Sequence, residues 1–244
     1  MKRTIAFIAF IALCQTLAFG QKKYKMVVET TDGNSVTFPT ENIKRIYFLE
    51  SNVSYNSCPD GNHPHLIDLG LPSGTKWACC NIGANAPGDY GNYYSWGETK
   101  PKEVYNWSNY IHCDGSSSSC HDIGSDIAGT QYDAATANWG APWRMPSREQ
   151  CEEFRTSCTY VWTSMNGVEG LRFTGPNGGS IFLPAAGNRW NNELANATVY
   201  GLYWSSTRYY AFLDKGYTFA FYSNYASWTD SSVAYGQPVR PVCK

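Results

Sequence analysis

The chain has 244 residues, with 19 lysines and arginines against 20 aspartates and glutamates, so its formal net charge is −1 at pH 7. A chain of this length can bury a substantial core and form one domain of ordinary size with a small appendage. Because no basic field is present to attract phosphates, no nucleic-acid partner is expected.

Residues 1–20 have the pattern of a signal peptide. Lys2 and Arg3 are followed by the apolar run Ile5–Leu13 and by small residues near position 20. The apolar run is shorter than the ~20 residues that span a bilayer. We therefore expect an exported protein, extracellular or at the cell surface. Lipid anchoring at Cys14 is disfavoured, because Leu13 before it is larger than lipidation sites usually accept.

Residues 21–50 are expected to form a small β module. The segments 26–30 and 35–38 flank Asp32-Gly33, a hairpin turn signal, and a third apolar piece covers 43–48. An isolated hairpin is marginally stable, so we expect this module to dock on a neighbour or on a partner in the cell envelope. The polar residues 51–63 are interpreted as a linker.

The main domain is assigned to residues 64–244. Its predicted elements are, in chain order, strands over 66–71 and 76–82, long ordered loops over 83–138, one helix within 139–162, and strands over 171–173 and 180–184. The helix is expected to begin after Pro146 with Ser147 as N-cap, and Gln150 supplies the partner of a capping box. Buried Trp96 and Trp107, together with cysteines, are expected to hold the loops in place.

The cysteines indicate an oxidising compartment. Eight remain after Cys14, an even number that indicates disulfides in an exported chain: Cys58, Cys79, Cys80, Cys113, Cys120, Cys151, Cys158 and Cys243. Cys113 and Cys120 flank a Gly/Ser loop and are the expected local pair; the other pairings stay open. No Cys-x-x-Cys pair occurs, so no metal site and no cofactor are expected.

Geometry restricts two of the remaining pairings. Cys79 and Cys80 are adjacent, so on a strand their side chains point to opposite faces and need different partners. Cys151 and Cys158 lie in the expected helix, roughly 10 Å apart along its axis. That separation is beyond the reach of a disulfide, so these two cysteines are not expected to pair with each other.

The segment Gly187–Cys243 is unusually aromatic. Between Tyr200 and Tyr235 it holds 13 aromatic residues against four charged ones, interleaved with Ser, Asn and Thr. Rigid aromatic rings mixed with small polar groups are typical of recognition surfaces. We expect Trp204, Phe219 and Phe221 to belong to an ordinary β-core, whereas for the segment as a whole a binding surface is favoured over pure core.

Several separated motifs within residues 63–243 resemble the Fibrobacter succinogenes major paralogous domain family. They are DLGLPSGTKWA (68–78), YSWGET (94–99), ANWG (137–140), WRMPS (143–147), GGSIFLPAAG (178–187), YWSS (203–206) and VRPV (239–242). The resemblance implies an exported or surface protein of a Bacteroidetes-type bacterium. It also implies an α+β, C-type-lectin-like domain whose first and last strands pair and whose long loops present a ligand surface. Residues 25–48 resemble a short β module often found before such domains.

Some members of this family are variable proteins of diversity-generating retroelements. In them, adenine-directed mutation randomises codons between the equivalent of Gly187 and the C-terminal Arg-Pro-Val. Ordinary drift in exposed loops is the alternative. By this resemblance the candidate ligand-binding positions are Arg189, Trp190, Asn191, Asn192, Arg208, Tyr209, Tyr210, Ser223, Asn224, Tyr225, Ser227, Trp228, Asp230, Ser231 and Ser232.

Neither calcium-dependent sugar binding nor catalysis is favoured. The segments 190–192 and 237–239 are similar to lectin calcium motifs but lack the Asp that each requires. Ser205-Ser206 lacks a nucleophile-elbow pattern, Glu152-Glu153 fits a solvated helix face, and the four histidines fit surface or structural roles. We therefore expect a non-enzymatic recognition or adhesion protein with a protein or glycan ligand. The alternative is a structural or assembly component of the cell envelope without a dedicated ligand.

Overall fold

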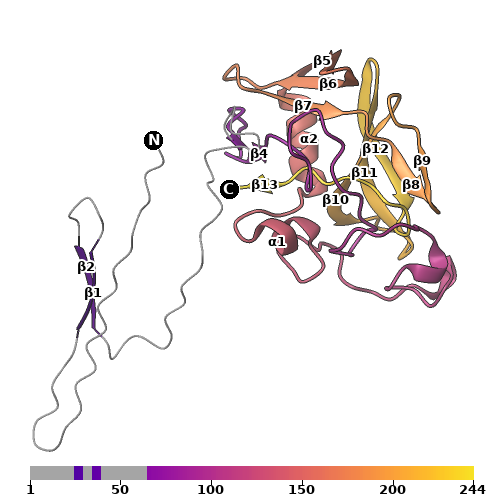
Figure 1. The fold of residues 1–244 in the computed structure, drawn as a ribbon, viewed down its shortest axis with the longest axis horizontal. Coiled ribbons are helices and arrows are strands. Elements are labelled where there is room, and N and C mark those ends of the chain that lie inside the picture. The colour runs from indigo at the N-terminus through magenta and orange to yellow at the C-terminus, as the bar shows by residue number, and fades with distance from the viewer. Residues whose placement is uncertain (1–24, 30–34, 40–64) are drawn as a thin grey trace, which may run out of the picture. The chain divides into compact units, whose positions relative to one another are not determined.

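The computed structural model describes residues 25–29, 35–39 and 65–244, which fall in two units, one within Met1–Ser51 and one within Asn52–Lys244. In the first unit, β1 (Lys25–Glu29) pairs antiparallel with β2 (Ser35–Pro39), with Val27 opposite Thr37 (Figure 1). The two strands expected in the small β module are therefore present. The predicted signal peptide, the apolar piece 43–48, the linker 51–63 and Cys58 lie outside the described residues.

In the described part of the second unit, residues 65–244, the chain forms four small sheets, two α-helices and two short 3-10 helices. In chain order its elements are β3 (Leu66–Ile67), β4 (Lys76–Ala78), η2 (Trp107–Asn109), η3 (Ser117–Ser119), α1 (Ala134–Trp139), α2 (Arg148–Ser157), β5 (Thr159–Met165), β6 (Val168–Thr174), β7 (Ser180–Pro184), β8 (Asn188–Trp190), β9 (Glu193–Ala195), β10 (Gly201–Arg208), β11 (Lys215–Tyr222), β12 (Tyr225–Ser232) and β13 (Val242–Cys243). Its sheets have the orders β10-β11-β12, β13-β4-β3, β5-β6-β7 and β8-β9, and every strand pair in them is antiparallel.

The β10-β11-β12 sheet separates two hydrophobic clusters. Successive side chains of a strand point to opposite faces, so Tyr203 and Phe219 face the first cluster whereas Trp204 faces the second. Trp204, Phe219 and Phe221 are all buried, as expected from the sequence. Gly201 lies opposite Phe221 in the register, and a Cβ atom there would lie 2.0 Å from the Phe221 ring. Only glycine fits at this position.

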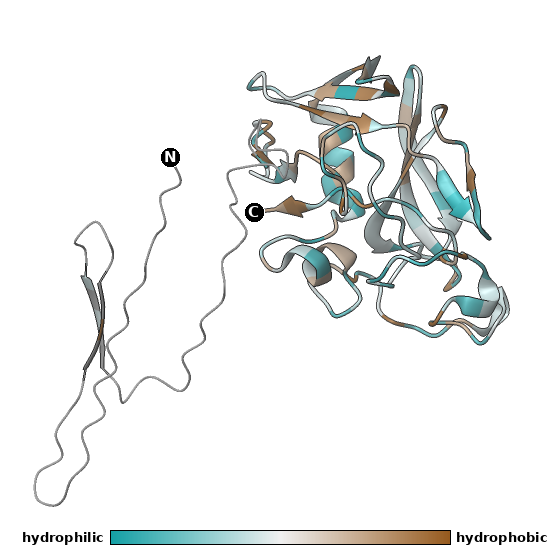
Figure 2. Ribbon diagram, in the orientation of Figure 1, coloured by the Kyte–Doolittle hydropathy of each residue, from teal (hydrophilic) through white to brown (hydrophobic). Residues whose placement is uncertain are grey.

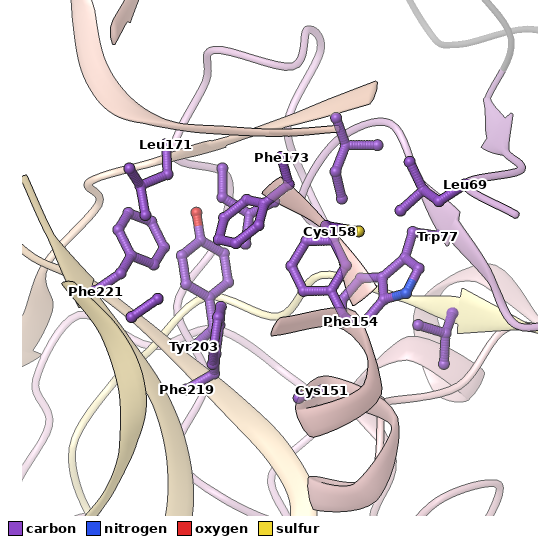
Figure 3. Packing of buried hydrophobic residues seen from close by; sticks show 14 of the residues in the cluster. Leu69, Trp77, Cys151, Phe154, Cys158, Leu171, Phe173, Tyr203, Phe219 and Phe221 are labelled. Carbon is purple, nitrogen blue, oxygen red and sulfur yellow. The ribbon is translucent and has the colours of Figure 1, made fainter. Parts of the chain in front are cut away.

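The first cluster is built around Phe154 of α2 (Figure 3). The centroid of its ring lies 4.4 Å from those of Trp77 in β4 and Phe173 in β6, and 6.1 Å from that of Phe219 in β11. One helical side chain thereby joins three sheets. The helix begins as predicted, because Ser147 and Gln150 form the expected capping box.

The second cluster holds the long loops of residues 83–133. Buried aromatic side chains donate hydrogen bonds to backbone carbonyls: Trp96 Nε1 to Ser205 O at 3.0 Å, Trp204 Nε1 to Tyr94 O at 2.7 Å, and Tyr110 Oη to Trp96 O at 2.8 Å. These bonds connect the loops to β10 and to one another. Trp107 is only partly buried against this cluster.

The C-terminal strand β13 is hydrophobic (Figure 2), and both of its residues are buried. Val242 pairs with Trp77 of β4, and β4 in turn pairs with β3. The resemblance implied that the first and last strands pair; in the structure, β4 lies between them. Arg240, two residues before β13, is 1% exposed. Its guanidinium donates to Cys79 O at 2.6 Å, Phe182 O at 2.9 Å and Asn81 Oδ1 at 2.8 Å.

The expected α+β class is wrong for this chain, because the described residues form a mainly β structure. The helices α1 and α2 have only 6 and 10 residues, whereas strands of seven or eight residues recur from β5 onwards. The sequence analysis placed a helix within 139–162, but α2 ends at Ser157 and β5 follows directly. The run Thr159–Thr163 is rich in β-branched and aromatic residues, which favour a strand. The C-type-lectin-like description depended on the α+β class and is not retained.

Smaller differences from the predicted elements have local causes. Only Leu66–Ile67 and Lys76–Ala78 are strands in the segments 66–71 and 76–82. The short helix α1 was missed, although Asp133 caps it by accepting hydrogen bonds from two backbone amides. Within the described ranges, no helix is long and apolar enough to cross a membrane.

We predict that replacing Arg240 destabilises the fold strongly. In Arg240→Met, the carbonyls of Cys79 and Phe182 lose their buried donors, and unfolding by urea is expected to show a loss of about 3 kcal/mol. The matched control is Arg172→Met, because Arg172 is exposed on β6 and its loss is expected to stay within about 0.5 kcal/mol. Equal free energies of unfolding for the two variants would contradict the assigned role.

Candidate ligand-binding surface

The fifteen candidate ligand-binding residues differ widely in exposure. The exposed ones are Asn191, Asn192, Tyr210, Ser223, Asn224, Tyr225 and Asp230. The partly buried ones are Arg189, Trp190, Arg208, Tyr209, Ser227, Trp228 and Ser231. Ser232 is buried, so its side chain cannot meet a ligand on the surface. Sequence position alone therefore does not define the surface.

The first group lies on the β8–β9 hairpin. Asn191 and Asn192 form its turn between Trp190 and Glu193, and Asn191 has a positive φ of 52°, which asparagine tolerates better than most residues. The backbone of Asn191 exchanges hydrogen bonds of 2.7 and 2.8 Å with Tyr105. The ring of Trp190 lies 4.8 Å from that of Tyr235 and packs against the second cluster. The asparagines are thus held in place while their side chains stay exposed.

Beside this hairpin lies an open groove of about 390 Å³, lined among others by Tyr93, Lys102, Tyr105, Arg189 and Asn192. The guanidinium carbon of Arg189 lies 5.1 Å from the centroid of the Tyr93 ring, within cation–π range. The hydroxyls of Tyr93 and Tyr105 donate to backbone carbonyls, and burial raises the pKa of both. The Lys102 ammonium is paired with Glu98 at 2.8 Å.

The second group lies on the loop between β10 and β11. We call Tyr209, Tyr210, Phe212, Leu213 and Tyr217 the aromatic loop patch. Tyr210 is 79% exposed and Phe212 59% exposed. The Tyr209 ring lies at the centre, 4.8 Å from Tyr210, 5.1 Å from Tyr217 and 6.2 Å from Phe212 between centroids. The patch is thus a set of rings gathered around Tyr209, of which Tyr210 and Phe212 are exposed to solvent.

Trp228 has contacts that support the structure. It packs against Phe219 of the first cluster, and its Nε1 donates to Glu152 Oε2 at 2.7 Å. The hydrogen bonds from Arg155 and then Trp228 lower the pKa of Glu152 to about 2. Arg208 also has a partner within the protein, because its guanidinium forms an ion pair with the carboxylate of Asp122 at 2.8 Å.

The third group forms the tip of the β11–β12 hairpin. Tyr222 and Tyr225 pair across the tip with ring centroids 5.1 Å apart, and Ser223 and Asn224 form the turn. The Tyr200 ring lies 5.4 Å from that of Tyr222. These rings are exposed and lie apart from the first cluster.

Strand alternation divides the candidates on β12 between two faces of the sheet. Trp228 pairs with Phe219 and Asp230 with Tyr217, so both lie on the face that carries α2. Ser227 and Ser231 point to the opposite face. The candidates from Arg189 to Ser232 therefore do not form one continuous surface.

Sequence analysis missed several residues of these surfaces. Phe212 and Leu213 were counted as part of an aromatic segment but not as site residues, although they sit between Tyr210 and the charged pair Asp214-Lys215. Tyr93 and Lys102 come from a loop far away in the sequence, and no periodicity links that loop to Arg189.

The described cysteines are arranged in three ways. Cys151, Cys158 and Cys243 are buried free thiols, so the disulfides expected for them from the even number of cysteines are wrong. Cys113 and Cys120, the expected local pair, form a disulfide. Cys79 and Cys80 lie in a bend after β4 with the imidazole of His65. Hydrogen bonds from Cys79 and then His65, together with the charge of Arg240, lower the pKa of the Cys80 thiol to about 5 against the effect of burial. The expectation that adjacent thiols point to opposite faces is wrong here, because the strand ends at Ala78.

Comparison with known proteins gives no assignment: no protein-family model, no curated protein and no solved structure matches the chain. The resemblance to the Fibrobacter succinogenes major paralogous domain family therefore stays an interpretation of sequence motifs.

We predict that Trp228→Phe raises the pKa of Glu152 above its present value of about 2, because the variant keeps the ring but loses the hydrogen bond. The bond stabilises the fold at pH values above about 4.5, the ordinary pKa of the carboxyl group, and its contribution is lost as the pH falls towards 2. A carboxyl titration by NMR measures the shift. Tyr222→Phe is the control, and an unchanged Glu152 pKa in Trp228→Phe would show that Arg155 alone sets it.

Proposed function

We propose that the protein is an exported, non-enzymatic recognition protein that binds a protein or glycan ligand through exposed loops between residues 187 and 235. The observation that carries the proposal is the aromatic loop patch. Tyr210, Phe212 and Leu213 of this patch are exposed and Tyr209 and Tyr217 partly buried, although the two core clusters bury the neighbouring Trp204 and Phe219. Exposed apolar groups gathered in one place are typical of interaction sites.

The backbone beneath the patch is held by specific hydrogen bonds. Tyr209 N donates to Lys215 O at 3.0 Å, Val233 N to Asp214 O at 3.0 Å, and Arg208 N to Ser125 O at 2.9 Å. A loop fixed in this way loses little conformational entropy when it binds a ligand. The patch therefore combines exposed apolar area with preorganisation, two properties of an efficient binding surface.

The chemistry of the patch suits either class of ligand. Tyrosines offer a ring face and a hydroxyl, which serve for stacking on sugars as well as for contacts with proteins. Phe212 and Leu213 add purely apolar area, which is typical of the buried centre of protein interfaces. The hydrophilic groove at Arg189 and the tip at Tyr225 lie on other elements and are treated as separate surfaces.

We predict that the double variant Tyr210→Ala/Phe212→Ala lowers ligand affinity at least ~10-fold, because exposed aromatic residues at the centre of an interface carry much of the binding energy. A glycan array and a library of displayed extracellular proteins identify the ligand, and titration of both proteins measures its affinity. The melting temperature is expected to change little, since both side chains are mostly exposed.

The matched control is Tyr160→Ala/Val161→Ala, which removes an exposed aromatic and an exposed aliphatic residue from β5. It is expected to leave the affinity unchanged. A ligand that binds both double variants like the unmodified protein would refute the assignment of the patch. Absence of any ligand in both libraries would favour the structural role in the cell envelope.

The proposal includes diversification at the exposed candidates only, such as Asn192, Tyr210 and Asn224. We predict that the flanks of the gene encode a reverse transcriptase and a near-copy of the region for residues 187–243 that differs at adenines. Sequencing those flanks measures this directly. A near-copy that differs at the codon of buried Ser232 would contradict the restriction to exposed positions. The absence of any near-copy would contradict diversification and leave an invariant binder.

A further inference from the structure

Three metal-binding side chains meet inside the second unit, away from the surfaces described above. They are His65, Cys79 and Cys80, which are 5%, 3% and 0% exposed. Their ligand atoms all lie within 4.8 Å of one another, and His65 Nδ1 is 3.1 Å from Cys79 Sγ. No other cluster of three such residues occurs in the described part of the chain.

The backbone explains why these three side chains converge. His65 directly precedes β3, and the backbone amide of Cys79 donates to His65 O at 2.9 Å, which continues the pairing of β3 with β4. Cys79 and Cys80 then lie in a bend, where strand alternation no longer separates their side chains. The same bend is held by Arg240, which donates to the carbonyl of Cys79.

We propose that His65, Cys79 and Cys80 bind a thiophilic d10 metal ion, with Zn²⁺ as the expected occupant and Cu⁺ as the alternative. Two thiolates and one imidazole are ligands that both ions accept. Ligand atoms around a tetrahedral zinc ion lie roughly 3.5 to 3.8 Å apart, given bond lengths of about 2.0 to 2.3 Å. The observed spacing meets this requirement after shifts of a few tenths of an ångström to about 1 Å.

The three side chains would fill three of the four positions of a tetrahedral zinc ion, and their surroundings are buried and largely apolar. The imidazole of His65 lies against Trp139 and Trp143, with ring centroids at 4.6 and 5.3 Å. Ala84 and Ile67 complete an apolar shell around the sulfurs. The cationic guanidinium of Arg240 lies beside the bend and forms no ion pair with a carboxylate among the described residues. A buried positive charge there stabilises the thiolate ligands.

The absence of Cys-x-x-Cys predicts no metal site from the sequence. That spacing is needed when a single turn supplies both thiolates, whereas here a bend brings adjacent cysteines together and the residue before β3 supplies the histidine. A bound ion would cross-link the residue before β3 to the bend after β4. It would add to the pairing of two very short strands and to the hydrogen bonds of Arg240 in this region.

The experiment is metal analysis and titration of the full chain, purified under reducing conditions without chelators. We expect one zinc per chain by elemental analysis. Cd²⁺ added to the metal-free protein is expected to give the ultraviolet charge-transfer absorbance of a cadmium–thiolate bond. A parallel titration with Cu⁺ distinguishes the two ions by competition with chromophoric chelators.

Cys80→Ala and His65→Ala are expected to weaken Zn²⁺ binding at least ~10-fold. Cys151→Ala and His121→Gln are the matched controls, since Cys151 is a buried thiol in α2 and His121 an exposed imidazole. Zn²⁺ is also expected to raise the melting temperature of the unmodified chain and of the controls but not of Cys80→Ala, which tests the site even if that variant is less stable. The proposal is overturned if no ion binds stoichiometrically, if the variants bind like the controls, or if mass spectrometry finds Cys79 and Cys80 in disulfides in the exported protein.

Discussion

The buried guanidinium of Arg240 is the constraint on which the rest of the second unit depends. A charged group this deep in the core is tolerated only when its donors find acceptors, and Arg240 finds them in Ala78, Cys79, Asn81 and Phe182. These residues come from the bend after β4 and from β7, so one side chain fixes the position of Arg240 relative to segments 58 to 162 positions earlier in the chain. Because the acceptors are mostly backbone carbonyls, the geometry of the chain itself is specified, not only the identity of the neighbouring side chains.

The aromatic residues of the second unit differ in burial according to their place relative to the β10-β11-β12 sheet. The β10-β11-β12 sheet lies between the two hydrophobic clusters, and its buried aromatic residues are members of these clusters. Aromatic residues just beyond the strands, such as Tyr210 and Phe212, have no cluster to join. The same composition therefore serves two purposes, and the position of a residue relative to the strand ends decides which purpose it serves.

The sequence predicted features that depend on local chemistry. The capping box at Ser147 and Gln150, the strands of the hairpin near Val27 and Thr37, and the burial of Phe219 all follow from propensity and spacing. The prediction was wrong where the helical pattern ended sooner than expected. The run Thr159–Thr163 lies in β5 and not in the second half of the predicted helix, and this also removes support for an α+β class.

The candidate surface was harder to predict because it depends on side-chain direction. A resemblance at the level of motifs marks a stretch of sequence, but it does not tell which residues of β12 face the core. Trp228 and Ser227 are adjacent in the sequence and lie on opposite faces of the sheet. The groove beside Arg189 and the cluster at His65 each combine segments that only the tertiary structure brings together, so no local signal reveals them.

The position of Arg240 and β13 in the chain has a consequence for synthesis and transport. The bend after β4 is completed only by residues that are made about 160 positions later. A ribosome therefore releases most of the second unit before the contacts of Arg240 can form, although β3 and β4 can pair earlier. For a protein proposed to be exported, this order lets the core close only after the C-terminal residues have been made, which suits a chain that crosses the membrane before its fold is complete.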